Sequence, residues 1–147
     1  MKDEREENYQ YCRRIAEEIE NVTDGKLYHC PYCGNDFCMD DAEEYETEDG
    51  DTAIHCPNCK EELLTDELEP LSVYDYFSDA LDIEFTIDAQ REYKGICIWV
   101  TVGGPSIWVD TNAGEVKLAW WGERATAYLS RSACNAVDEY GEELYNC

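Results

Sequence analysis

Basic side chains are scarce in this sequence. Its 147 residues contain 11 Lys and Arg against 35 Asp and Glu, which gives a formal net charge of −24 at pH 7. A surface with this balance repels nucleic acid and anionic membranes, and it attracts basic protein surfaces. The composition therefore argues against direct binding to nucleic acid or membranes and predicts a basic protein as the partner.

Long apolar segments are also missing. No run of apolar residues approaches the roughly 20 that a helix needs to cross a bilayer. The chain begins with charged residues, unlike the apolar centre of a signal peptide. Because 44% of the residues are hydrophobic, the chain can still form a packed core. We therefore expect a folded protein in the cytoplasm.

Histidine occurs only at His29 and His55, each directly before a cysteine. No Ser/His or Cys/His pair can therefore be assembled within residues 72–147, and nucleophilic catalysis is not expected there. Asp110 is the most unusual polar residue of the expected strands. We favour a hydrogen bond to a neighbouring turn over a catalytic role for it. These observations predict a protein that is not an enzyme.

Cysteine, by contrast, is abundant. An odd count of nine in a chain without a secretory signal argues against a disulfide framework. Four of the nine form two Cys-Pro-x-Cys pairs with 22 residues between them, and such pairs can place four thiolates tetrahedrally around Zn²⁺ at about 2.3 Å. A closed site of this kind leaves no open position for a substrate. We predict one structural zinc ion on four ligands: Cys30, Cys33, Cys56 and Cys59.

The sequence also permits other interpretations of the cysteines. Redox-active Cys-x-x-Cys motifs and free thiols are the main alternative to a metal site. His29, His55 or Cys38 could each replace one ligand. The cysteines outside the two pairs are expected to be small buried hydrophobes or surface thiols: Cys12, Cys38, Cys97, Cys134 and Cys147.

Acidic residues crowd the segment between the two pairs, which has no Lys or Arg from Gly34 to His55. Three readings apply: a solvated hairpin tip, a surface that imitates phosphates, and a calcium site, although the residues do not match an EF-hand loop. A charge of −24 equals that of about 40 Å of duplex at ~1.7 Å per charge, close to the diameter of about 40 Å of a compact chain. The candidate partner-binding acids are Asp36, Asp40, Asp41, Glu43, Glu44, Glu46, Glu48, Asp49, Asp51, Glu61 and Glu62.

Hydrophobic periodicity predicts an α+β fold. A helix is expected over residues 3–22, followed by a zinc-ribbon-like module with a hairpin that turns at 49–51. Residues 61–71 are interpreted as a linker, and no internal repeat is apparent. These elements form the first expected unit, residues 1–70.

The second expected unit, residues 71–147, is a four-stranded antiparallel sheet packed with two helices. Ser72 and Asp75 predict a capping box at the first of these helices, which is expected to run to Leu81. Alternating apolar residues predict the strands, joined by short turns such as Gly103-Gly104-Pro105. The last helix is expected to start near Ser130 or Ser132. Trp120 and Trp121 are adjacent, and an exposed Trp121 is a candidate anchor for a partner.

Two resemblances follow from these motifs. Residues 30–59 resemble a zinc ribbon or treble clef with paired knuckles. Residues 103–111, with Trp120-Trp121-Gly122 after them, are similar to small proteins carried by bacteriophages and conjugative elements. Very acidic proteins of that class resemble anti-CRISPR and antirestriction DNA mimics.

The second resemblance implies an inhibitor in the bacterial host cell. Its acids would occupy the nucleic-acid groove of a basic protein such as Cas9 or a restriction enzyme. The alternative is a zinc-ribbon adaptor that binds a basic or transcription-associated protein without displacing nucleic acid.

Overall fold

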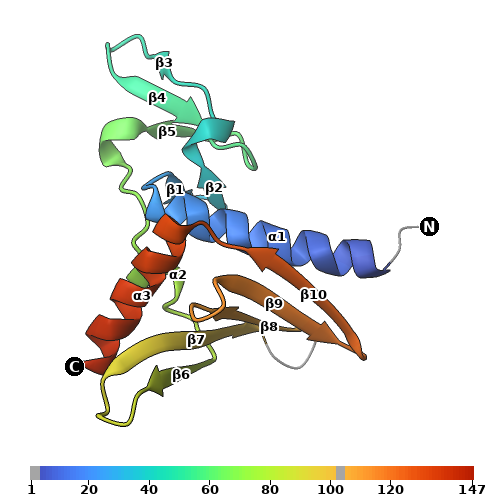
Figure 1. Ribbon diagram of the computed structural model, residues 1–147. Coiled ribbons are helices and arrows are strands. Elements are labelled where there is room, and N and C mark those ends of the chain that lie inside the picture. The colour runs from blue at the N-terminus through green and yellow to red at the C-terminus, as the bar shows by residue number, and fades with distance from the viewer. Residues whose placement is uncertain (1–3, 102–104) are drawn as a thin grey trace.

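The computed structural model describes residues 4–101 and 105–147, so Gly103 and Gly104 of the predicted turn lie outside the described residues. Residues 26–71, called the acidic module below, form small sheets on one side of the first helix. A larger sheet lies on the other side of this helix (Figure 1). The helices are α1 (Glu4–Thr23), α2 (Val73–Tyr76) and α3 (Arg131–Tyr145). The strands are β1 (Leu27–His29), β2 (Asp36–Cys38), β3 (Tyr45–Glu46), β4 (Thr52–His55), β5 (Glu62–Leu64), β6 (Asp82–Ile87), β7 (Tyr93–Thr101), β8 (Ser106–Asp110), β9 (Glu115–Trp120) and β10 (Glu123–Tyr128).

The larger sheet is antiparallel throughout, with the strand order β10-β9-β8-β7-β6. Its inner face carries alternating branched side chains, as period-two patterning requires. They are fully buried, and α1 and α3 cover them (Figure 1). The inner-face residues of the three central strands are Ile96, Ile98, Ile107, Val109, Val116 and Leu118.

The sheet has five strands, so the prediction of four strands was wrong. The missed strand, β10, buries only Ala127 fully, and its other residues are charged, small or exposed. Such a segment carries little of the large apolar alternation that identifies a strand. The turn before β10 is a two-residue type I′ hairpin, since Trp121 and Gly122 both have positive φ, 48° and 79°. Gly122 was therefore a better sequence signal for β10 than the side chains of the strand itself.

Helix α1 belongs to the core of the larger sheet. Its buried residues recur every three or four positions, and they join the same hydrophobic cluster as the sheet's inner face. They are Cys12, Ile15, Ala16 and Ile19. The helix ends at Thr23, and Gly25 with φ 72° reverses the chain into the acidic module.

The two later helices differ from expectation in one respect. The capping box at Ser72 and Asp75 is present, and α3 starts after the N-cap Ser130 as predicted. However, α2 ends at Tyr76, and Leu81 is 59% exposed. The Ser78 hydroxyl donates to the carbonyl of Asp75, and this local bond competes with continued helix.

The acidic module has its own small core. Strands β1 and β2 form one hairpin, and β3, β4 and β5 form a three-stranded sheet. The predicted hairpin turn is confirmed, because the Thr47 amide donates to the Asp51 carbonyl at 2.8 Å and Gly50 has φ 86°. Residues 61–71 are not a plain linker, since they form β5 and a 3-10 turn at Thr65–Glu67. Among the described residues, no helix is long and apolar enough to cross a membrane.

Gly141 allows α3 to approach β7 closely. A Cβ at this position would lie 2.5 Å from Tyr93 Oη and 3.1 Å from Ile96 Cβ. We expect Gly141→Ala to lower the free energy of unfolding by about 1–3 kcal/mol through overpacking. This loss should exceed the gain of about 1 kcal/mol in helix propensity. The change in the free energy of unfolding is measured by guanidinium titration, with tryptophan fluorescence as the probe.

Asn135→Ala is the matched control, because Asn135 is exposed on the same helix. It should leave stability unchanged or raise it by up to about 0.7 kcal/mol. If Gly141→Ala is as stable as the parent protein, the close contact between α3 and β7 is not required.

Candidate metal centre

The acidic module is built from two copies of one local unit, which corrects the expectation of no internal repeat. In the first unit, the Cys30 amide donates to the Asn35 carbonyl and the Gly34 amide to the Cys30 carbonyl, both at 3.0 Å. In the second, the Cys56 amide donates to the Glu61 carbonyl and the Lys60 amide to the Cys56 carbonyl, both at 2.9 Å. A short strand and a 3-10 turn follow each unit.

The repeat leaves a short signal in the sequence, which the prediction missed. The shared residues are His-Cys-Pro-x-Cys, an acid three positions later, and then an apolar residue, Phe37 or Leu63, which is buried. The positive φ of the knuckle falls on Gly34 in one unit (77°) but on Lys60 in the other (66°). Glycine therefore marks only one of the two left-handed positions.

The two units bring four thiols together. The Sγ atoms of Cys30, Cys33, Cys56 and Cys59 all lie within 4.8 Å of one another. The Cys30–Cys59 and Cys33–Cys56 separations are 3.7 Å and 3.8 Å. A tetrahedron with metal–sulfur bonds of about 2.3 Å has edges of about 3.8 Å. The cluster therefore has the dimensions of a tetrathiolate metal site.

The proposed substitute ligands are engaged elsewhere. His29 Nδ1 lies 2.8 Å from a carboxylate oxygen of Asp36. His55 Nδ1 lies 3.1 Å from the carbonyl of Lys60, and its ring stacks on Tyr45 at 4.9 Å. Neither histidine nor Cys38 joins the metal-ligand cluster found among the described residues.

The protonation of the cluster shows why a cation suits it. The Asn35 amide and the Asn58 side chain lower the pKa of Cys33 to about 6. The Glu61 amide lowers the pKa of Cys59, but burial and the hydrogen bonds to Cys56 and its neighbours raise it to about 12. Four thiolates at this spacing repel one another unless a metal ion lies between them.

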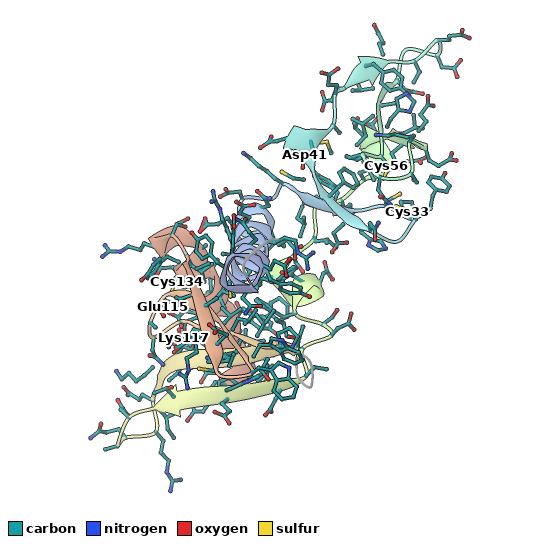
Figure 2. All side chains as sticks on the ribbon, turned by 90° about the vertical axis from the view of Figure 1, so that its right-hand side faces the viewer. Cys33, Asp41, Cys56, Glu115, Lys117 and Cys134 are labelled. Atoms are coloured by element: carbon teal, nitrogen blue, oxygen red, sulfur yellow. The ribbon has the colours of Figure 1, made fainter. Side chains whose placement is uncertain are left out.

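Burial makes the site closed. Cys30 and Cys56 are fully buried and share a hydrophobic cluster with Phe37, Ile54 and Leu63. Figure 2 places Cys33 and Cys56 inside the acidic module, away from the larger sheet. A closed tetrathiolate site stabilises a fold rather than binding a substrate.

The candidate partner-binding acids are all exposed, and they fall into three groups. One group surrounds the first knuckle and its 3-10 turn, where Asp41 is labelled in Figure 2. A second lies around the β3–β4 hairpin, and the third, Glu61 and Glu62, follows the second knuckle. The module holds only two lysines; Lys26 pairs with Asp40 at 3.1 Å, and Lys60 donates to the carbonyl of Pro57. Most of these carboxylates therefore face solvent.

Trp121 does not lie with these acids. It is 86% exposed at the β9–β10 turn, on the larger sheet, and its ring meets Trp120 edge-on at 5.5 Å. Asp110 behaves as expected, since it accepts hydrogen bonds from the turn amides of Asn112 and Ala113. It also pairs with Lys117 at 3.5 Å.

Comparison of the chain with models of known families, with curated proteins and with solved structures finds no match.

Metal removal should unfold the acidic module and spare the larger sheet. The two units have separate hydrophobic clusters, and all four tryptophans lie in residues 99–121. We expect one metal ion per chain by elemental analysis. A strong chelator should abolish the ordered NMR signals of residues 26–68 but leave tryptophan fluorescence nearly unchanged.

Cys56→Ser should reproduce the effect of chelation without a chelator. Cys38→Ser is the matched control, because Cys38 lies in the same module but outside the cluster. It should keep the metal. Loss of metal in both variants, or in neither, would contradict the ligand assignment.

Proposed function

We propose that the four cysteines bind a structural Zn²⁺ ion, and that the module around it inhibits a basic protein by imitating the charge of nucleic acid. This is the action of an anti-CRISPR or antirestriction protein, and Cas9 is the candidate target. Such an inhibitor would act in the cytoplasm of a bacterial host. The observation that supports this proposal is the density of exposed acids on the acidic module.

That density can be compared with DNA. Residues 26–71 contain fourteen acids and two lysines, and a zinc ion on four thiolates adds a charge of about −2. The resulting charge of about −14 occupies a unit that would be about 24 Å across if compact. Duplex DNA carries about fourteen charges over ~24 Å of its axis. The module therefore matches the linear charge of the ligand that it would replace.

Zinc suits this role for a physical reason. Crowded carboxylates repel one another and favour an open chain. A unit of about 46 residues is also close to the size below which a core alone seldom suffices. The metal links the two knuckles, so the acids are held in place before the partner arrives. Preorganisation then reduces the entropy lost on binding.

The adaptor is the second candidate, and Trp121 favours it. A fully exposed tryptophan at a positive φ is costly in solvent and in backbone strain, and tryptophan is a common interface anchor. Because this residue lies away from the acids, an adaptor could hold its partner through the larger sheet. Binding of that kind would survive saturating DNA, whereas charge mimicry would not.

The first test is competition for a nucleic-acid site. Purified protein is titrated into guide-loaded Cas9, and into a restriction enzyme in parallel, while bound target DNA is measured. We expect displacement at near-stoichiometric protein, and weaker displacement as salt rises because exposed charges are screened. The test variant carries Gln at Glu43, Glu44, Glu46 and Glu48.

Its control removes the same charge elsewhere. Amide replacements at Asp79, Glu92, Glu139 and Glu142 also remove four charges, from exposed positions outside the module. We expect the module variant to lose displacement by about tenfold or more and the control variant to lose little. Equal losses would mean that net charge, not the acidic module, causes inhibition. If these nucleases release no DNA, they are not the targets, and a host-protein pull-down in the presence of saturating DNA then tests the adaptor.

A further inference from the structure

The outer face of the larger sheet has an aromatic centre. Trp99 and Trp108 are directly opposite each other on β7 and β8, and their rings stack at 6.0 Å with an angle of 19° between planes. The buried residues of α1 and α3 pack with the inner-face residues of the sheet, and no described element lies over the outer face (Figure 1). Small polar residues suffice on a solvated sheet face, so two adjacent indoles indicate a surface that is covered.

Charge is distributed unevenly across this face. The β6 edge carries Asp82 and Glu84, whereas the β10 edge carries Arg124. Among the described residues, none of these three forms an ion pair within the chain. Between the edges, Lys117 on β9 pairs with Asp110 and Glu115, and Figure 2 shows Glu115 and Lys117 on the side of the sheet away from α1.

We propose that a second copy of this chain covers the face, related by a two-fold axis parallel to the strands. This axis places β8 over β8 and the β6 edge of each copy over the β10 edge of the other. Trp108 then meets its own counterpart, and Trp99 meets Lys117 of the second copy, a cation–π arrangement. Asp82 lies over Thr126 of the second copy, and Arg124 is two residues away on the same strand, within reach of the Asp82 carboxylate. The strands of the copies stay within about 30° of each other, as in aligned sheet packing.

The charges at the edges favour this axis over the alternative. A two-fold axis perpendicular to the strands would stack β6 on β6 and bring the acidic edges together. With the parallel axis, each acidic edge meets the edge that carries Arg124, and Asp110, which meets its own counterpart, is paired with Lys117 in its own chain. The acidic modules, which stand beyond α1 from this face (Figure 1), are then at opposite ends of the dimer, where screening over about 8 Å weakens their repulsion.

The size of the face predicts a weak dimer. Five strands about 4.8 Å apart, with five or six residues of ~3.4 Å each, give a patch of about 20 by 20 Å. That patch is smaller than the ~800 Å² that each partner buries in a standard interface. We therefore expect a monomer–dimer equilibrium in the micromolar range. This dimer does not depend on the proposed function of the acidic module.

Sedimentation equilibrium of the full-length, zinc-loaded protein tests the proposal over a range of concentrations. Trp108→Thr keeps a strand-forming residue and should raise the dissociation constant by about tenfold or more. Trp121→Ser is the matched control, because it removes an exposed tryptophan that is not on this face. It should leave the dissociation constant unchanged.

A charge swap tests the axis itself. Asp82→Lys and Arg124→Glu should each weaken the dimer, and the double variant should restore it. Within one chain these residues lie on opposite edges, about 19 Å apart across the strands, so rescue reports contact between copies. Because Asp82 also accepts a hydrogen bond from the Ile83 amide, the free energy of unfolding of each variant is measured as well, so that a loss of folding is not mistaken for a loss of association.

Each outcome decides the proposal. Association that Trp108→Thr weakens, together with rescue of the single charge variants by the double charge variant, supports it. A parent protein that stays monomeric throughout, association that Trp108→Thr leaves intact, or a folded double charge variant that fails to rescue would overturn it. DNA competition by the acidic module is a separate readout, so either conclusion can fail without the other.

Discussion

The shortage of cations constrains every part of this molecule. Acids outnumber bases by 35 to 11, so most carboxylates that take part in the fold must find other donors. Phenols supply them: Tyr76 donates to Glu18 at 2.7 Å, and Tyr93 donates to Asp138 at 2.8 Å. Burial raises the pKa of both phenols, and their carboxylate partners raise it further, so both remain donors at neutral pH.

These bonds lie at the joints between elements. Tyr76 connects α2 to α1, and Tyr93 connects β7 to α3. At the start of α3, both the amide and the hydroxyl of Ser130 donate to Glu20 of α1, at 2.6 Å and 2.8 Å. Neutral donors thus hold carboxylates between the helices and the sheet, and each such bond is a charge-assisted one. The fold of the larger unit tolerates its acidity because it uses those acids as acceptors.

The acidic module meets the same constraint differently. Tyr45 donates to Glu62, but most carboxylates there have solvent alone as their partner, and the small core around Ile54 must hold them. A metal ion is the cross-link that suits this case, because it can tie both knuckles together at one point in a module with a small core. A disulfide would not persist in a reducing compartment.

Sequence reasoning worked where one residue type determines the geometry. The paired Cys-Pro-x-Cys motifs gave the four clustered cysteines, Ser72 with Asp75 gave the capping box, and Asp110 gave the bond to its turn. It failed where tertiary contact decides. The strand β10 exists because β9 offers its edge, not because its own side chains demand burial.

The placement of α1 is another case of this kind. Periodicity identified its apolar face, centred on residues such as Ile15 and Ile19, but an apolar face does not specify which core receives it. The repeat of the two knuckles was missed although both contain His-Cys-Pro-x-Cys, since glycine marks the left-handed position in one knuckle, at Gly34, whereas Lys60 has it in the other.

The separation of the two units has a functional consequence. In residues 26–71 most acids have no internal partner, Asp36, Asp40 and Glu62 being exceptions, so their number is less constrained by the fold. In the larger unit, acids such as Glu18, Glu20 and Asp138 are fixed by internal partners and cannot be rearranged without loss of stability. A molecule that divides its carboxylates in this way can change the acids of the cysteine-rich module while the sheet keeps its fold. Under the proposed function, it is these exposed acids that determine partner choice.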